Sequence, residues 1–180
     1  MSTTATGQTY AIDPAHTTAE FVVRHLMIAK VRGRFTGVSG TIEVADGTDV
    51  PASVNAKIEA ATVATGDAQR DGHLASPDFL DAATYPAIEF RSTKISGSAA
   101  EFEIHGDLTI HGTTRPVVLS ASYEGRSTDP WGNRRIGYEA HGKINRKDFG
   151  LTWNQALESG GVLVGDDVKI ELSVEGIAAK

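Results

Sequence analysis

The stretch that decides the fold is VKIELSV, residues 168–174. Its apolar side chains fall on every second residue, with Lys169, Glu171 and Ser173 between them. This period of two is typical of a β-strand with one buried face and one face in water. Parallel sheets that are covered on both faces have continuous apolar runs instead. The stretch therefore predicts an antiparallel strand.

The same alternation recurs through most of the chain, which has about eight long strands joined by short connections. Such segments occupy residues 18–25, 31–35, 41–44, 54–60, 88–92, 102–108, 115–123 and 136–144. The sequence predicts a single all-β domain over residues 1–180, with a frayed tail at residues 1–8 and an ordered core at about 9–177. We expect an antiparallel eight-stranded β-barrel, which has room for side chains or for one small ligand. A β-sandwich is the competing fold.

Turn residues punctuate the strands. Ser96-Gly97-Ser98 and His111-Gly112 are predicted to be turns. Glycines inside strands (Gly33, Gly106 and Gly142) suit sharp strand coiling and also leave space in a barrel interior.

Residues 65–90, TGDAQRDGHLASPDFLDAATYPAIEF, break the alternation. Thr65 or Asp67 can cap a short helix there. A lone helical segment in an all-β chain predicts a lid over one mouth of the barrel. In this interpretation Phe79 and Leu80 fix the lid to the core.

Composition excludes several classes of protein. The chain has no cysteine, which rules out disulfides and thiolate chemistry. Its net charge is −6 and it has no Lys/Arg-rich run, so we expect no nucleic-acid partner. No apolar run approaches the roughly 20 residues of a membrane helix, so we expect no integral membrane segment. The first ten residues, MSTTATGQTY, lack an apolar signal core, and we expect a cytoplasmic protein.

Four motifs in order resemble the bacterial YceI-like family over roughly residues 9–176. They are YAIDPAHTTAEFVVRH (10–25), HLASPDFLDAATYPAIEFRS (73–92), GDLTIHGTTRPVVL (106–119) and NRKDFGLTW (145–153). The resemblance implies a lipocalin-like barrel with one short helical lid segment and a lipid-binding cavity. It implies a ligand such as a polyisoprenoid, a related quinone or a fatty-acid amide. Many members of the family are periplasmic, and the lack of a signal core sets this sequence apart from them.

Every second residue of a strand points to the same face, and this parity assigns a set of side chains to the inner face of the barrel. There they either fill the barrel or line a cavity. With the family resemblance we favour a cavity that binds a long-chain apolar lipid for carriage, storage or sequestration. Each buried CH₂ of such a ligand contributes about 0.8 kcal/mol. The predicted ligand-binding residues are Phe21, Val23, His25, Val31, Phe35, Ile42, Val54, Ile58, Ile88, Phe90, Phe102, Ile104, Leu119, Ile136, Tyr138, Trp153, Ile170 and Leu172.

Four polar residues are candidates for a functional or a structural role. His25 shares a face with Phe21 and Val23, so it either contacts a ligand head group or is a buried histidine bonded to the protein. Arg70 on the lid either meets an anionic head group or is solvated. Arg146 and Asp148 can pair locally and clamp a strand bend.

Other functions are alternatives. His105, Asp107 and His111 share a polar face, but a turn intervenes, so we expect no metal and no cofactor. No G-x-S-x-G, G-x-G-x-x-G or phosphate-loop motif is present. The competing functions are an enzyme acting on a small hydrophobic substrate in the same pocket and a packed barrel that acts through its surface. A homodimer is also open, because apolar surface at a mouth could pair.

Overall fold

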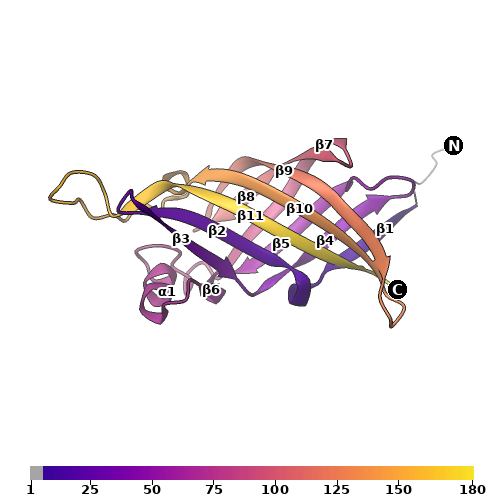
Figure 1. Cartoon of the computed structure of the whole chain (residues 1–180), viewed down its shortest axis with the longest axis horizontal. Coiled ribbons are helices and arrows are strands. Elements are labelled where there is room, and N and C mark those ends of the chain that lie inside the picture. The colour runs from indigo at the N-terminus through magenta and orange to yellow at the C-terminus, as the bar shows by residue number, and fades with distance from the viewer. Residues whose placement is uncertain (1–5) are drawn as a thin grey trace.

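A computed structural model describes residues 6–180 as a twisted sheet closed into an elongated barrel (Figure 1). The strands are β1 (Gly7–Ile12), β2 (Thr18–His25), β3 (Ala29–Phe35), β4 (Val38–Ala45), β5 (Ser53–Glu59), β6 (Val63–Ala64), β7 (Ala87–Ser98), β8 (Glu101–Ile110), β9 (Thr113–Thr128), β10 (Arg134–Asn145) and β11 (Val164–Ala178). The helical elements are α1 (Ala68–Ala75) and the short 3₁₀ turns η1 (Pro14–His16), η2 (Ala60–Thr62) and η3 (Arg146–Phe149). Of the predicted frayed tail, residues 1–5 lie outside the described residues, whereas Gly7 and Gln8 belong to β1, so the prediction was wrong there.

The barrel closes between β1 and β11. Neighbouring strands follow the order β1-β4-β5-β7-β8-β9-β10-β11, and β1 pairs with β11 from Tyr10↔Ala178 to Ile12↔Gly176. The result is a closed eight-stranded antiparallel barrel with one short helix, which confirms the predicted fold class. β2, β3 and β6 extend the sheet toward one end of the barrel. There β2 pairs with the first half of β11, β3 pairs with β2, and β6 pairs with β3.

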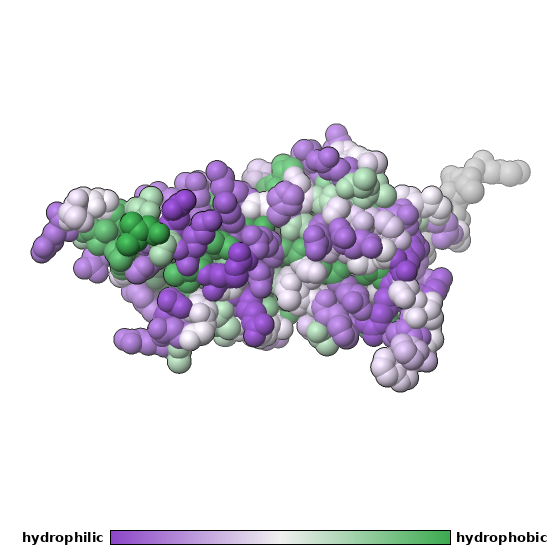
Figure 2. Space-filling model, viewed as in Figure 1, coloured by the Kyte–Doolittle hydropathy of each residue, from purple (hydrophilic) through white to green (hydrophobic). Residues whose placement is uncertain are grey.

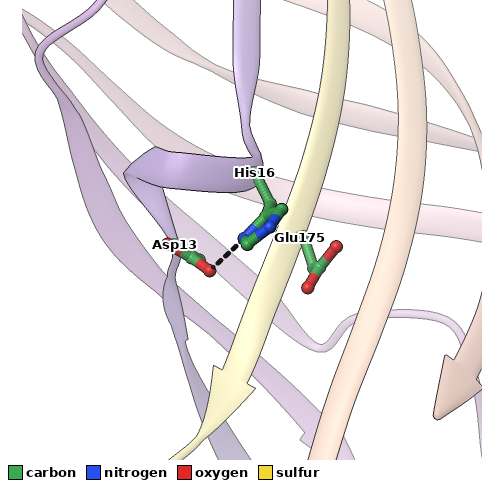
Figure 3. A group of neighbouring side chains, drawn as sticks. All are labelled: Asp13, His16 and Glu175. Atoms are coloured by element: carbon green, nitrogen blue, oxygen red, sulfur yellow. Dashed lines mark hydrogen bonds and ion pairs between the residues drawn. The ribbon is translucent and has the colours of Figure 1, made fainter. Parts of the chain in front are cut away.

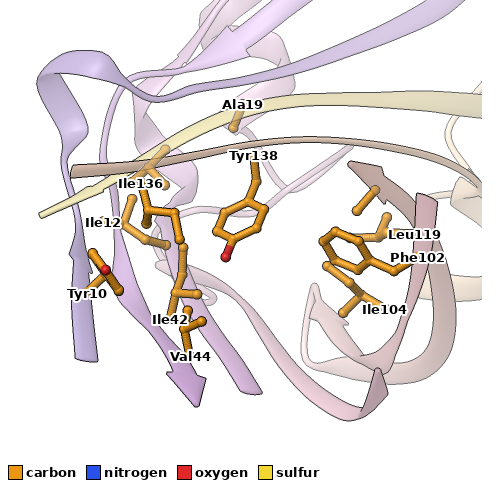
Figure 4. Packing of buried hydrophobic residues seen from close by; sticks show 12 residues of the cluster. Tyr10, Ile12, Ala19, Ile42, Val44, Phe102, Ile104, Leu119, Ile136 and Tyr138 are labelled. Atoms are coloured by element: carbon orange, nitrogen blue, oxygen red, sulfur yellow. The ribbon is translucent and has the colours of Figure 1, made fainter. Parts of the chain in front are cut away.

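The hydrophobic alternation puts apolar side chains inside the barrel. Tyr10, Phe102 and Ile136 are almost fully buried, at 1–2% exposure. Figure 4 shows the Tyr138 ring between the group around Tyr10 and Ile136 and the group around Phe102 and Ile104. The Phe102 and Tyr138 rings meet edge to face, with 6.0 Å between centroids.

Two predictions about glycines and turns need correction. The space that Gly33 and Gly106 leave in the interior is filled by aromatic rings: a Cβ on Gly33 would lie 2.3 Å from the Phe21 ring, and one on Gly106 would lie 2.4 Å from the Phe90 ring. These glycines thus seat aromatic side chains instead of adding open volume. The turn predicted at residues 96–98 lies later, because β7 runs to Ser98.

The helix α1 begins where the sequence predicts. The Asp67 carboxylate accepts hydrogen bonds from the backbone N–H groups of Gln69 and Arg70, as an N-cap does. In Figure 1, α1 lies at the left end of the barrel, and the C-terminus lies at the right end. Within residues 6–180, no helix has the length and hydrophobicity that a membrane crossing requires.

Candidate functional site

The barrel encloses an elongated cavity of about 420 Å³. Except for Ile136, every predicted ligand-binding residue lines it. Phe21, Phe90 and Leu172 are only partly buried although they point inward, because the cavity leaves their surfaces uncovered. That these side chains contact a ligand stays a prediction.

Ile136 does not line the cavity. Its side chain is 1% exposed and packs in the apolar cluster with Tyr10 and Tyr138, and it lies within contact distance of a Cβ placed on Gly176. Strand parity correctly places Ile136 inside the barrel. The prediction that it lines the cavity was wrong, because neighbouring side chains of the apolar cluster cover it.

The end of the cavity near the C-terminus is closed. The Tyr138 hydroxyl donates to the backbone carbonyl of Asp49 at 2.7 Å, and burial raises the pKa of this phenol well above its usual range. Arg126 donates to the Asp49 carboxylate at 3.0 Å and to the carbonyl of Thr48 at 2.8 Å. These bonds hold residues 48–51 across the end, and the buried Pro51 lines the cavity there. We call this the closed end.

The opposite end is open. Arg24, His25 and Arg70 line the cavity and are nevertheless exposed, so this end is the mouth. His25 is thus at the rim of the cavity, not a buried histidine in the core. The Arg70 guanidinium donates to the hydroxyl and the carbonyl of Thr65, at 2.7 and 2.9 Å. Polar groups therefore gather at the mouth, and the wall behind them is apolar.

The segment predicted to be a lid lies beside the mouth. His73, Leu74, Phe79 and Leu80 all line the cavity. The rings of His73 and Phe79 both pack against Trp153, at centroid distances of 4.7 and 5.3 Å. Phe79 is buried, as expected of a residue that fixes the segment to the barrel. Movement of this lid stays a prediction.

Arg146 fastens the loop after η3 to the barrel. Its side chain is 3% exposed and donates to the carbonyls of Gly165, Leu151 and Trp153 at 2.8–2.9 Å. Burial lowers the pKa of its guanidinium, and the nearest carboxylate is Asp166, at 3.8 Å. The predicted pairing with Asp148 was wrong: Asp148 is exposed, and Arg146 points inward because its donors meet the carbonyls of the loop.

Sequence reasoning missed part of the wall. Val38, Leu108, Val168 and Val174 line the cavity, and the same parity rule applied to whole strands would have found them. Arg24 also lines it, although it has the opposite parity to His25. The pairing of β2 with β11 shifts register at this end, between Val164 and Val168, so the period of two is not reliable there.

The two histidines that were considered as metal ligands each contact another side chain. His105 bonds Glu103 at 3.0 Å, and the His111 ring packs on Tyr85. Among residues 6–180, the group with ligand atoms close enough for a metal is instead Asp13, His16 and Glu175 (Figure 3).

That group is part of an ion-pair network around Arg135. Arg135 donates to Asp13 at 2.8 Å and to Glu175 at 2.6 Å, and His16 bonds the same Asp13 oxygen at 2.8 Å. The bond from His16 and that from Arg135 together outweigh burial and lower the pKa of Asp13. The Arg135 guanidinium already donates to both carboxylates and so holds them in place, which makes the arrangement structural. Burial raises the pKa of Asp129, but bonds from Asn133 and Arg135 outweigh it and hold that pKa well below its usual range.

Comparison with known proteins gives consistent matches over almost the whole chain. The model of the YceI-like domain family matches residues 10–176. The curated Protein YceI of Escherichia coli O157:H7 is 38% identical over 173 residues, which cover 95% of this chain and 87% of that protein.

Solved structures agree. The YceI protein of Campylobacter jejuni superposes with a TM-score of 0.75 at 29% identity, covering 87% of this chain and 90% of that one. A polyisoprenoid binding domain from Saccharophagus degradans, implicated in plant cell wall breakdown, superposes with a TM-score of 0.68 at 17% identity. That match covers 94% of this chain and 98% of the other and indicates a shared fold.

Proposed function

This chain belongs to the YceI-like domain family, and on that premise we propose that it binds a long-chain apolar lipid, such as a polyisoprenoid, inside its barrel. The role would be carriage, storage or sequestration of the lipid. The observation that carries the proposal is the apolar cavity of about 420 Å³ that opens at one end of the barrel. Ligand pockets in proteins measure about 300–1,000 Å³.

The distribution of polar groups gives the ligand a direction. The wall between the two ends consists of side chains such as Val54, Ile58 and Ile170, which offer no hydrogen bond. Exposed Arg24, His25 and Arg70 stand at the mouth. The tail of a bound lipid would therefore point toward the closed end, and its head group would lie at the mouth.

Burial of the tail supplies enough free energy for binding. Ten buried CH₂ groups correspond to about 8 kcal/mol. That equals a Kd of about 1 μM before the cost of ordering the chain is subtracted. Hydrophobic burial does not depend on direction, so such a cavity selects for length and width of the tail more than for its chemistry.

Binding accounts for the site better than catalysis does. Nucleophilic catalysis by a serine or threonine hydroxyl typically uses a neighbouring base such as histidine. Among residues 6–180, the histidine side chains that bond another side chain bond carboxylates: His16 to Asp13, His73 to Asp78 and His105 to Glu103. Of these, His73 lines the cavity, where its ring packs between Phe79 and Trp153.

The test is to identify what the protein carries. The protein is purified without detergent and extracted with organic solvent, and the extract is analysed by mass spectrometry. We expect a lipid with a long hydrocarbon tail at close to one molecule per chain. Recovery of no lipid, together with no binding of added isoprenoid alcohols, would refute the proposal, and recovery of a chemically altered ligand would favour the enzyme alternative.

A further inference from the structure

We infer that the mouth end of the barrel docks on the surface of a lipid bilayer through an apolar tip beside the cavity. The tip consists of the β2–β3 turn, Leu26–Ile28, and the apolar residues Leu157, Val162 and Leu163 of the neighbouring loop 154–163. The inference rests on the proposed function, because it names the source from which the cavity takes its lipid.

The tip exposes large side chains that a folded chain normally buries. Ile28 is 81% exposed and Met27 is 50% exposed. Leu26 and Met27 have φ values of 53° and 59°, so the turn holds two bulky residues in the left-handed region. Figure 2 shows hydrophobic residues gathered at the end where this turn and the loop project. Isolated exposed apolar residues are common, but an apolar cluster on one projection indicates an interaction site.

The two parts of the tip form one unit. The backbone N–H of Leu26 donates to the carbonyl of Leu163 at 2.9 Å, and His25 pairs with Val164. The loop itself is braced by a bridge between Ala156 and Val162. The tip is therefore held in place at the end of β2 and β11.

The mouth of the cavity is directly adjacent to the tip. Leu163 of the tip lines the cavity, and so do His25 and Val164, which directly adjoin Leu26 and Leu163 in the chain. Figure 1 shows α1, which lines another side of the mouth, at the same end of the barrel. A lipid tail could pass from a bilayer into the cavity without crossing water.

Charges near the tip fit an anionic surface. Arg24 and Lys30 face each other across β2 and β3, one pair behind the turn, and both are exposed. Neither has an ion-pair partner within residues 6–180, although the net charge of the chain is −6. Of the nearby acids, Asp166 and Asp167 pair with Lys147 and Lys143, whereas Glu158 is an exposed acid on the loop. Apolar side chains backed by basic ones are the pattern of surfaces that bind anionic membranes.

The shape favours a bilayer over a protein partner. A stable protein interface needs about 800 Å² on each partner, in patches of matching shape. The tip is instead a projection made of the tight β2–β3 turn and the longer loop 154–163 (Figure 1). A bilayer accepts such a projection because lipids rearrange around it.

The experiment measures flotation of the full chain with vesicles of phosphatidylcholine, with and without phosphatidylglycerol. The variant Met27→Ser/Ile28→Ser should lower the bound fraction by about tenfold, since two large apolar side chains no longer insert. Lys30→Glu should reduce binding to vesicles that contain phosphatidylglycerol and change it little on phosphatidylcholine alone. The matched control is Trp131→Ser, because Trp131 is 82% exposed on the β9–β10 turn at the other end of the barrel.

Three results would overturn the docking inference. The first is a wild-type protein that does not float with either vesicle. The second is a tip variant that floats like wild type. The third is a tip variant whose oligomeric mass, measured by light scattering, differs from that of wild type, since a second copy would then cover the tip. Uptake of farnesol, measured without vesicles, separates this inference from the proposed function. Wild type and tip variant should take up farnesol equally, and a wild type that does not bind it contradicts the proposed function itself.

Discussion

Filling the cavity from its wall should weaken lipid binding without unfolding the barrel. Leu172 in β11 and Ile58 in β5 both line the cavity and are partly buried. Replacing either residue by Trp adds about six non-hydrogen atoms to the wall, which displace a similar number of ligand carbons. At about 0.8 kcal/mol for each displaced CH₂, binding loses up to about 5 kcal/mol.

A ligand that slides toward the mouth would recover part of this loss, so we expect at least a tenfold higher Kd for Leu172→Trp and Ile58→Trp. The folded state should tolerate both changes, because the added ring enters open volume instead of packed core, where overpacking costs about 1–3 kcal/mol. The assay is calorimetric titration with a defined isoprenoid alcohol, with thermal unfolding measured in parallel.

The control is Val118→Trp. Val118 lies between the cavity-lining residues Val117 and Leu119, but its side chain points outward and is 46% exposed. The Val118→Trp variant should bind lipid with the same Kd as wild type. Unchanged affinity in both inner variants, with the fold intact, would refute the assignment of the cavity as the binding site.

Three further predictions concern the elements that shape the cavity. Arg146→Met leaves three carbonyls without their donor and should lower the free energy of unfolding by about 3 kcal/mol or more in urea denaturation, at about 1–3 kcal/mol for each unsatisfied group. The control Lys147→Met, at the exposed neighbour, should stay within about 0.5 kcal/mol of wild type. Equal effects of the two variants would contradict the role of Arg146 in fastening the loop. Asp67→Ala removes the cap of α1, which is worth about 1 kcal/mol, and should speed lipid exchange about fivefold in a stopped-flow transfer assay. Gly72→Ala should slow exchange, because alanine favours the helix and its Cβ would meet nothing within 4 Å; identical rates in both variants would mean that α1 does not gate the cavity. The pKa values of Asp13 and Asp129 are lowered in the folded state, so the stability that these carboxylates contribute is complete above their unfolded pKa of about 3.9 and is lost as the pH falls below that value through the folded pKa values. Arg135→Met should therefore raise the pH midpoint of acid unfolding, followed by circular dichroism. An unchanged midpoint would contradict the role of the ion pairs around Arg135.

The strand pattern alone determined the architecture and most of the wall. In strands such as 168–174, successive side chains point to opposite faces as a property of the extended backbone, so parity assigns each residue to the inside or the outside without knowledge of its partners. For that reason parity alone places Ile58, Phe90 and Leu172 on the inner face. The helix start at Asp67 was equally local, because a cap bonds N–H groups two and three residues away.

Only the tertiary structure decided which inward residues face open space. Ile136 in β10 and Leu172 in β11 both point into the barrel. Ile136 packs in an apolar cluster with Tyr10 of β1, whereas Leu172 borders the cavity. Likewise, Gly106 leaves no void because the Phe90 ring of the neighbouring strand lies over it. The partners of Arg146 come from the loop that folds back over η3, and parity carries no information about such a loop. Inside and outside follow from the geometry of one strand, but cavity and packed core depend on what all eight strands bring to the same height of the barrel.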